Sequence, residues 1–148
     1  MKIKTQLLDL CNLLVNKRIK DYKNEIDLIK ESIESNDKVS NEQDDSGNSK
    51  LLDDLEKNMN YLGDAQKNKD YLQLIRPNLV SEQVVLGSIV KTDSLSFFIA
   101  ISIGKIEIET QDYYIISLQS PIGQHVKSKS KGHQFEFNSK RYTITEVL

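Results

Sequence analysis

Apolar residues in the first half of the chain recur mostly at steps of three and four positions. Such spacing puts side chains on one face of a helix, so we predict a helix that packs along that face. The repeat returns more weakly between Leu52 and Ile75, which predicts a second helix. The apolar positions of the first helix are Ile3, Leu7, Leu8, Cys11, Val15, Ile19, Tyr22, Ile26, Ile29 and Ile33, and those of the second are Leu52, Leu55, Met59, Leu62, Leu72 and Ile75.

Residues 36–49, between the two helices, contain almost no apolar side chain and are rich in Asn, Asp and Ser. These side chains compete for backbone hydrogen bonds, so the segment is predicted to be a turn. The pattern therefore predicts an antiparallel helical hairpin, or coiled coil, with an acidic tip. A helix over residues 4–35 would be roughly 48 Å long at about 1.5 Å per residue. Gly63 weakens the second helix by about 1 kcal/mol relative to alanine, which pairing with the first helix must offset.

The period changes after Arg76-Pro77-Asn78, because Pro77 pushes the residue before it out of helical geometry. Beyond it, runs of β-branched and aromatic residues bounded by glycine or aspartate predict strands. Ser120 and Pro121 are typical of the N-cap and first position of a helix, predicted over Pro121–Lys127. The predicted strands are Val84–Val90, Ser96–Ile103, Lys105–Glu109, Tyr113–Leu118, Gln134–Phe137 and Arg141–Val147, of which the last two form a closing hairpin.

The fold class that follows is α+β: an N-terminal antiparallel helical hairpin, then a small antiparallel sheet with one short helix. We predict three regions along the chain. The hairpin covers residues 1–75 with its tip at about 36–49, a linker covers 76–80, and a second domain covers 81–148.

Charge and cysteine content narrow the function classes. The 148 residues include 20 Lys and Arg against 22 Asp and Glu, a formal net charge of −2. General affinity for nucleic acid needs an excess of basic residues, so the composition does not favour it. A single cysteine, Cys11, allows no disulfide within the chain and suits a reducing compartment. We find no signal peptide and no run of about 18 apolar residues, and we expect a soluble cytoplasmic protein without membrane contact.

The chain shows no catalytic or metal-binding group of its own. His125 and His133 lie near Lys129 and Lys131 without a cysteine or an acidic cluster, so a zinc site is poorly supported. No nucleophilic triad and no glycine-rich phosphate loop stand out. We therefore expect neither an enzyme nor a cofactor of its own.

Four phrases occur in a specific order in the second half of the chain. They are Leu86-Gly87-Ser88-Ile89-Val90, Ser120-Pro121-Ile122-Gly123, Gly132 and Tyr142-Thr143-Ile144. In this order they resemble the C-terminal domain of the Gre family of transcription elongation factors, over about residues 80–148. That family runs roughly Gly-Ser-x-Val, Ser-Pro-(apolar)-Gly, Gly-Lys-x-x-Gly-Asp and Tyr-x-Ile. Here Ser128 replaces a usual Gly and His133 a usual Asp, and the preceding hairpin has the family's length and order.

The resemblance implies a fold and a partner. The C-terminal domain would have an FKBP-like sheet, similar to that of FK506-binding prolyl isomerases. It would dock on the rim of the secondary channel of bacterial RNA polymerase, with Ser120, Pro121, Ile122 and Gly123 at the contact. The hairpin would reach through the channel, where acidic residues at the tip help to hold a Mg²⁺ of the polymerase active site and a water. The polymerase then cleaves its own backtracked transcript by two-metal chemistry.

The tip departs from the family's cleavage phrase, which resembles Gly-Asp-Leu-Ser-Glu-Asn. This chain has Gln43-Asp44-Asp45-Ser46-Gly47-Asn48 instead. Aligned from the turn, Asp44 stands for the aspartate, Gly47 falls where the glutamate would be, and Asp45 is the candidate for the second carboxylate. We predict Asp44 and Asp45 as the residues delivered to the polymerase. The alternatives are a tip that is only a solvated acidic turn, and a factor that occupies the channel and modulates or inhibits without cleavage.

Three further hypotheses remain open. In the Gre context Lys17, Arg18, Lys20 and Lys23 would face the nascent RNA, but we favour the alternative that they pair with Asp21, Glu25 and Asp27 on the same helix. A different class of function is a peptide-binding or prolyl isomerase-like module, although the chain has no Trp and few Phe. A third class is an adapter that uses the hairpin to bind proteins other than polymerase.

Overall fold

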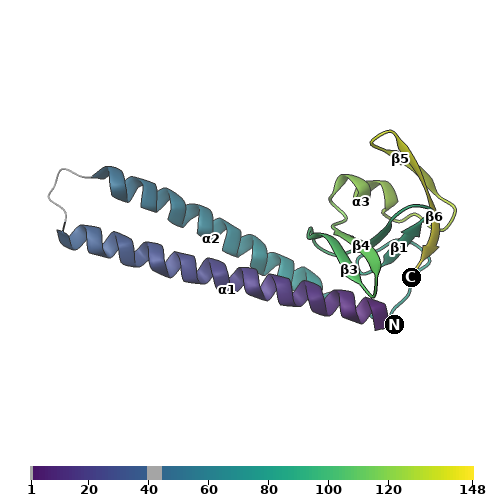
Figure 1. The fold of residues 1–148 in the computed structure, drawn as a ribbon, viewed down its shortest axis with the longest axis horizontal. Coiled ribbons are helices and arrows are strands. Elements are labelled where there is room, and N and C mark those ends of the chain that lie inside the picture. The colour runs from purple at the N-terminus through teal and green to yellow at the C-terminus, as the bar shows by residue number, and fades with distance from the viewer. Residues whose placement is uncertain (1, 40–44) are drawn as a thin grey trace. The chain divides into compact units, whose positions relative to one another are not determined.

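The computed structural model describes residues 2–39 and 45–148 (Figure 1). Two long helices come first, α1 at Lys2–Val39 and α2 at Asp45–Gln73. Six strands and a short helix follow, which confirms the predicted α+β class. They are β1 (Ile89–Thr92), β2 (Ser96–Ile99), β3 (Gly104–Ile108), β4 (Gln111–Ile116), α3 (Pro121–Val126), β5 (Gln134–Phe137) and β6 (Lys140–Val147).

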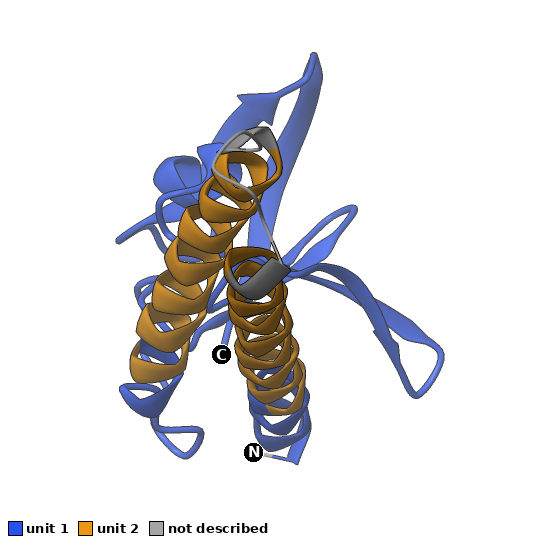
Figure 2. Cartoon of the chain, turned by 90° about the vertical axis from the view of Figure 1, so that its left-hand side faces the viewer, with its two compact units in different colours: residues 1–12, 71–148 blue, residues 13–70 orange. Residues whose placement is uncertain are grey.

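The chain divides into two compact units, which are coloured separately in Figure 2. The hairpin unit comprises residues 13–70, and the sheet unit comprises residues 1–12 and 71–148. Both long helices therefore contribute residues to both units. The sheet unit contains the first turns of α1 and the end of α2 as well as all six strands.

The apolar stripe predicted for the hairpin is only partly buried in the hairpin unit, since Leu52 and Met59 of α2 are each 54% exposed. Val15, Ile26 and Ile29 of α1 and Ala65 of α2 are buried. The rings of Tyr22 and Tyr61 add a contact between the helices, with centroids 5.6 Å apart. A Cβ atom added at Gly63 would meet nothing within 4 Å, so no close packing requires glycine there.

The helices extend further into the polar segment than the sequence pattern predicts, since α1 runs to Val39 and α2 begins at Asp45. Polar side chains bond to one another there across the two helices. Asn36 Nδ2 donates to Asn48 Oδ1 at 3.1 Å, and Asn48 Nδ2 donates to Asp37 Oδ1 at 2.9 Å. Because these groups satisfy one another, they compete less for the backbone bonds that a helix needs.

The sheet has the strand order β3-β4-β2-β1-β6-β5. All neighbouring strands are antiparallel except β2 and β4, which run parallel with Phe97 opposite Tyr114 and Ile99 opposite Ile116. The prediction of a small antiparallel sheet holds for the other pairs and did not include this parallel one. The β3–β4 hairpin places β4, rather than β3, beside β2, and alternation within a strand does not record which strand lies next to it.

One core cluster of the sheet unit lies between the sheet and α3. Its buried residues are Val84, Val90, Phe97, Ile99, Val126, Phe135, Tyr142 and Ile144. Ile122 of α3 packs against this cluster, so the short helix is held by two apolar residues on one side. A single short helix beside the sheet is what the sequence predicted.

The segment before β1 is not a strand, although the sequence pattern predicted one over Val84–Val90. Val84 instead bonds to the loop after α3: its N donates to Lys129 O at 2.8 Å, and Ser128 N donates to Val84 O at 2.9 Å. Gly87 then turns the chain with φ of +93°, a conformation that strands do not contain.

Candidate functional site

The loop around Ser120 starts helix α3. Ser120 is the N-cap, and its Oγ accepts a hydrogen bond from Gly123 N at 3.1 Å. The same hydroxyl donates to Ser117 O at 2.7 Å. Pro121 occupies the first turn, where its missing N–H costs nothing. The hydroxyl of Ser120 and the ring of Pro121 therefore both serve the local turn.

Gly123 and Ile122 complete this loop and face inward. A Cβ atom on Gly123 would collide with the carbonyl oxygen of Ser117 and come within 2.9 Å of the Leu118 backbone, so only glycine fits. Ile122 is half-buried against the core. Pro121 is exposed, and it is the member of the phrase Ser120–Gly123 that presents a side chain to solvent. Contact of this loop with polymerase stays a prediction.

The predicted catalytic carboxylates fall at the edge of what the structure describes. Asp44 lies outside the described residues, and Asp45 is described only as the first residue of α2. Other acids toward the end of α1 are described: Asp37 accepts a hydrogen bond from Asn48, and Glu34 is exposed. Within residues 2–39 and 45–148, no three His, Cys, Asp or Glu side chains gather where they could hold a metal ion.

The four basic residues predicted to face RNA have different surroundings on α1. Lys17 Nζ lies 2.8 Å from Asp21 Oδ2 in an exposed pair, as the coiled-coil alternative predicts. Arg18 is half-buried and lines a crevice of about 190 Å³ with Tyr22, Tyr61 and Asp64. Lys20 and Lys23 are exposed. An RNA-facing role for these four residues stays a prediction.

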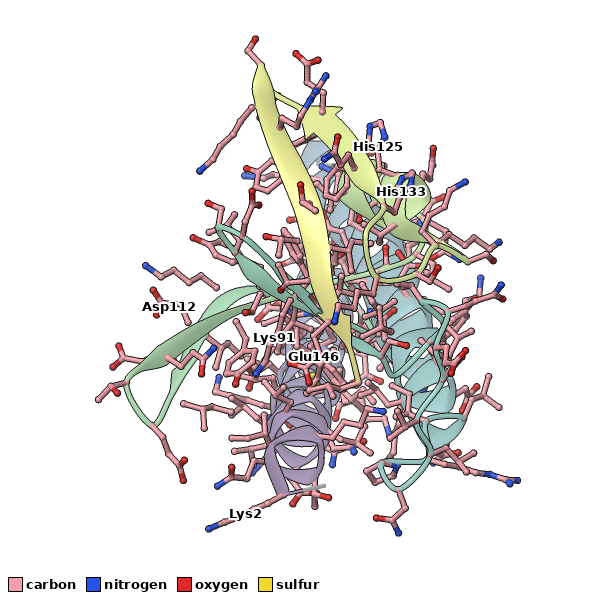
Figure 3. The ribbon with its side chains drawn as sticks, turned by 90° about the vertical axis from the view of Figure 1, so that its right-hand side faces the viewer. Lys2, Lys91, Asp112, His125, His133 and Glu146 are labelled. Carbon is pink, nitrogen blue, oxygen red and sulfur yellow. The ribbon has the colours of Figure 1, made fainter. Side chains whose placement is uncertain are left out.

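Sequence reasoning missed a stack of rings on the sheet unit. His125 and His133 lie close together in Figure 3, and both stack on Phe135, with centroids 5.7 and 6.3 Å away. Phe135 stacks in turn on Tyr142 at 5.2 Å. Part of this stack could have been predicted from the sequence. His133 and Phe135 are two positions apart, and residues at that spacing lie on one face of an extended chain.

Sequence reasoning also missed Lys4, which is 2% exposed. Its Nζ donates to Leu79 O at 2.7 Å, and burial lowers the pKa of Lys4. Its position contained a signal, since Lys4 precedes Leu7 by three residues and Cys11 by seven. Lys4 thus lies within the apolar stripe of α1, where a solvated lysine would not be expected.

Comparisons with known proteins find similarity to a few solved structures at low identity. No family model matches the chain, and no curated protein matches it. Among solved structures, the GreA factor homolog 1 (Gfh1) of Thermus thermophilus is 14% identical, with a TM-score of 0.35 over 93% of this chain and 94% of that chain. Gfh1 of Thermus aquaticus is 17% identical over 90% of both chains, and another structure described as the transcription factor Gfh1 is 15% identical over 92% of both, each with a TM-score of 0.35. Likeness at this level assigns neither a family nor an activity to the chain.

A further finding concerns membranes. None of the helices formed by the described residues is both long enough and apolar enough to cross a bilayer.

Proposed function

We propose that this protein is a Gre-like factor that binds bacterial RNA polymerase at the rim of its secondary channel and acts on paused or backtracked transcription complexes. The proposal rests on the four ordered phrases in the second half of the chain together with the long hairpin that precedes them. The tip would enter the channel, and the sheet unit would supply the docking surface.

The observation that carries this proposal is where the family's glycine positions fall in the backbone. Gly87 and Gly132 have φ of +93° and +94°, and Gly123 has no room for a Cβ. At Ser128, where the family usually has glycine, φ is +62°. These four positions all favour glycine for physical reasons, so the sequence resemblance and the local geometry agree residue by residue. The agreement supports a Gre-like domain, and the partner follows from the resemblance.

The protein itself would contribute carboxylate oxygen atoms to the cleavage reaction. Asp44 and Asp45 would present ligands suited to a Mg²⁺ held by the polymerase, which itself performs the hydrolysis. The protein would bind, orient the carboxylates and remain unchanged. It would need no cofactor of its own, and its contact with nascent RNA would be indirect.

A purified backtracked complex tests this function directly. The Asp44→Ala/Asp45→Ala variant should reduce transcript cleavage by about tenfold or more, a scale typical of lost support at a metal site, while binding to polymerase is retained. Asp53→Ala/Asp54→Ala is the matched control, because it removes two adjacent aspartates from α2 away from the tip. Failure of the natural protein to bind polymerase would overturn the whole proposal. Binding without any cleavage across pH and Mg²⁺ concentration would overturn the cleavage activity alone.

A channel-occupying modulator without cleavage activity is the second candidate, favoured by Gly47. This residue stands where cleavage factors have glutamate, and it is exposed. A Cβ there would meet only Asn36 Nδ2, at 3.9 Å, so a longer side chain fits. In the same assay, Gly47→Glu should increase cleavage if a missing carboxylate limits the natural protein, whereas Gly47→Gln should not.

A prolyl isomerase-like module remains the alternative from another class. Its relatives use an open aromatic pocket, but Phe97, Phe98 and Phe135 are all buried in this chain. An isomerisation assay on a prolyl peptide should therefore show no activity above the uncatalysed rate.

A further inference from the structure

A pocket of about 460 Å³ opens in the sheet unit, beside the turn that follows α2. The surrounding apolar side chains are unusually exposed: Leu74 by 69%, Leu79 by 60%, Val80 by 61% and Val85 by 44%. Large apolar side chains gathered this closely on a surface mark an interaction site more often than chance. The pocket is lined by Lys4, Leu74, Arg76, Leu79, Val80, Ser81, Val85, Leu86, Gly87 and Ser88.

Hydrogen bonds hold the walls of this pocket in place. Lys4 Nζ donates a hydrogen bond to Leu79 O at 2.7 Å, and Leu79 N donates to Arg76 O at 3.1 Å. Elsewhere in the lining, Ser88 Oγ accepts a hydrogen bond from Val85 N at 3.0 Å. Gly87 packs so tightly that a Cβ would lie 2.9 Å from Ile75 Cγ2. The pocket is therefore part of the folded unit and does not depend on a loose side chain.

The charged side chains that line the pocket are all positive. Lys4 and Arg76 both line it, and the lining contains no Asp or Glu. No ion pair among the described residues involves either cation. Burial lowers the pKa of Lys4, which reflects the cost of holding an ammonium group without a carboxylate partner. A ligand carboxylate would reduce that cost.

We propose that this pocket is a docking site for an apolar peptide segment of a partner protein that carries an aspartate or glutamate. An aliphatic side chain of the segment would pack against Leu74, Val80 and Val85, and its carboxylate would pair with Arg76 at the mouth and approach Lys4. The volume lies within the range of about 300–1,000 Å³ that is usual for ligand sites. No aromatic side chain lines the pocket, which disfavours nucleic acid because unpaired bases bind by stacking. This site is independent of the polymerase proposal.

Selection from a random peptide library displayed on phage, with the full-length protein as bait, tests the site. Selected peptides should contain Asp or Glu next to Leu, Ile, Val or Phe. Their affinity, measured by fluorescence anisotropy on synthetic copies, should fall by about tenfold in Arg76→Glu, a loss of about 1.4 kcal/mol. Arg141→Glu is the matched control, since it changes the charge of another exposed arginine of the same unit by the same amount and should leave affinity unchanged.

Three outcomes would overturn the assignment. The first is the absence of any peptide selected above bare support, and the second is selected peptides without a carboxylate. The third is equal binding to Arg76→Glu, with circular dichroism showing that this exposed substitution leaves the fold intact. Sedimentation adds a separate check. If the natural chain dimerises and Val80→Asp abolishes the dimer, a second copy of the chain occupies the pocket instead of an acidic peptide.

Discussion

Ser128 occupies a backbone conformation that glycine adopts more easily. Its φ is +62°, in the left-handed region where a Cβ atom is unfavourable. The conformation persists because Ser128 N bonds to Val84 O and the adjoining Lys129 O accepts from Val84 N. The loop after α3 is thereby fixed to the segment before β1. Serine carries a conformational cost here that the surrounding hydrogen bonds offset.

Ser128→Gly should therefore stabilise the protein. We expect the free energy of unfolding to rise by about 1 kcal/mol, the typical cost of a left-handed non-glycine residue less the added entropy of the unfolded chain. Urea denaturation followed by circular dichroism measures the change. Ser130→Gly is the control, because Ser130 is exposed in the same loop and has no positive φ. The control should lose stability, and a gain of similar size in both variants would contradict the explanation.

Buried Lys4 should make the free energy of unfolding vary with pH in the alkaline range. Burial lowers its pKa in the folded chain below the ordinary value of 10.5, which the unfolded chain keeps. Between these two pKa values the unfolded chain binds more protons, so the free energy of unfolding rises with pH in that window. Below the folded pKa the cost is fully present, and above 10.5 it is gone.

Comparison with Lys4→Met isolates this effect. As pH rises through the window, the natural chain should gain stability relative to the variant, as measured by urea denaturation at each pH. Lys23→Met, at an exposed site on α1, controls for the loss of a lysine and should keep a constant difference from the natural chain. A constant difference for Lys4→Met as well would show that the ammonium group is not desolvated.

At the scale of single elements, the end of the hairpin depends on a small polar network. Asn48 Nδ2 and Oδ1 bond to Asp37 and Asn36, so this one side chain connects α2 to α1 twice. The predicted tip of about 36–49 contains all three residues. Their mutual bonds allow the helices to continue to Val39 and from Asp45. The network thus joins the last described turn of α1 to the first turn of α2.

Asn48→Ala should loosen this end of the hairpin. Removing two exposed hydrogen bonds should cost about 1 kcal/mol in total, before the gain from alanine's higher helix propensity. Asn60→Ala is the matched control, since it makes the same change at an exposed position in the middle of α2. Amide hydrogen exchange near residues 34–37 should accelerate only in Asn48→Ala. Equal exchange rates in the two variants would mean that the network does not hold the helices together.

At the scale of the whole molecule, the two compact units do not coincide with the boundary between the hairpin and the sheet along the chain. Residues 1–12 of α1 and the end of α2 belong to the sheet unit, where Leu7, Cys11, Leu72 and Ile75 are buried. The proposed function needs both units, because docking would use the sheet unit and the acidic tip belongs to the hairpin. The acidic-peptide site, in contrast, lies entirely within the sheet unit.

The sequence by itself determined the elements whose signal is local. The three- and four-residue spacing predicted α1 and α2, because the apolar side chains on one face of a helix recur at that spacing within its own sequence. Ser120 and Pro121 predicted the start of α3, because capping involves only neighbouring residues. The ordered phrase from Gly87 to Ile144 indicated the second half of the fold, and its glycine positions coincide with backbone that favours glycine.

Only the tertiary structure decided which distant segments meet. The parallel pairing of β2 with β4 and the bonding of Val84 to Lys129 join residues far apart in the chain, and no local period encodes such partners. The place of Lys4 in the apolar stripe of α1 indicates burial, but only the tertiary structure shows that its Nζ donates to Leu79 O. Its burial, like the pocket beside it, arises from packing between α1 and the turn after α2. Packing of this kind is a property of three-dimensional proximity, which the order of residues does not display.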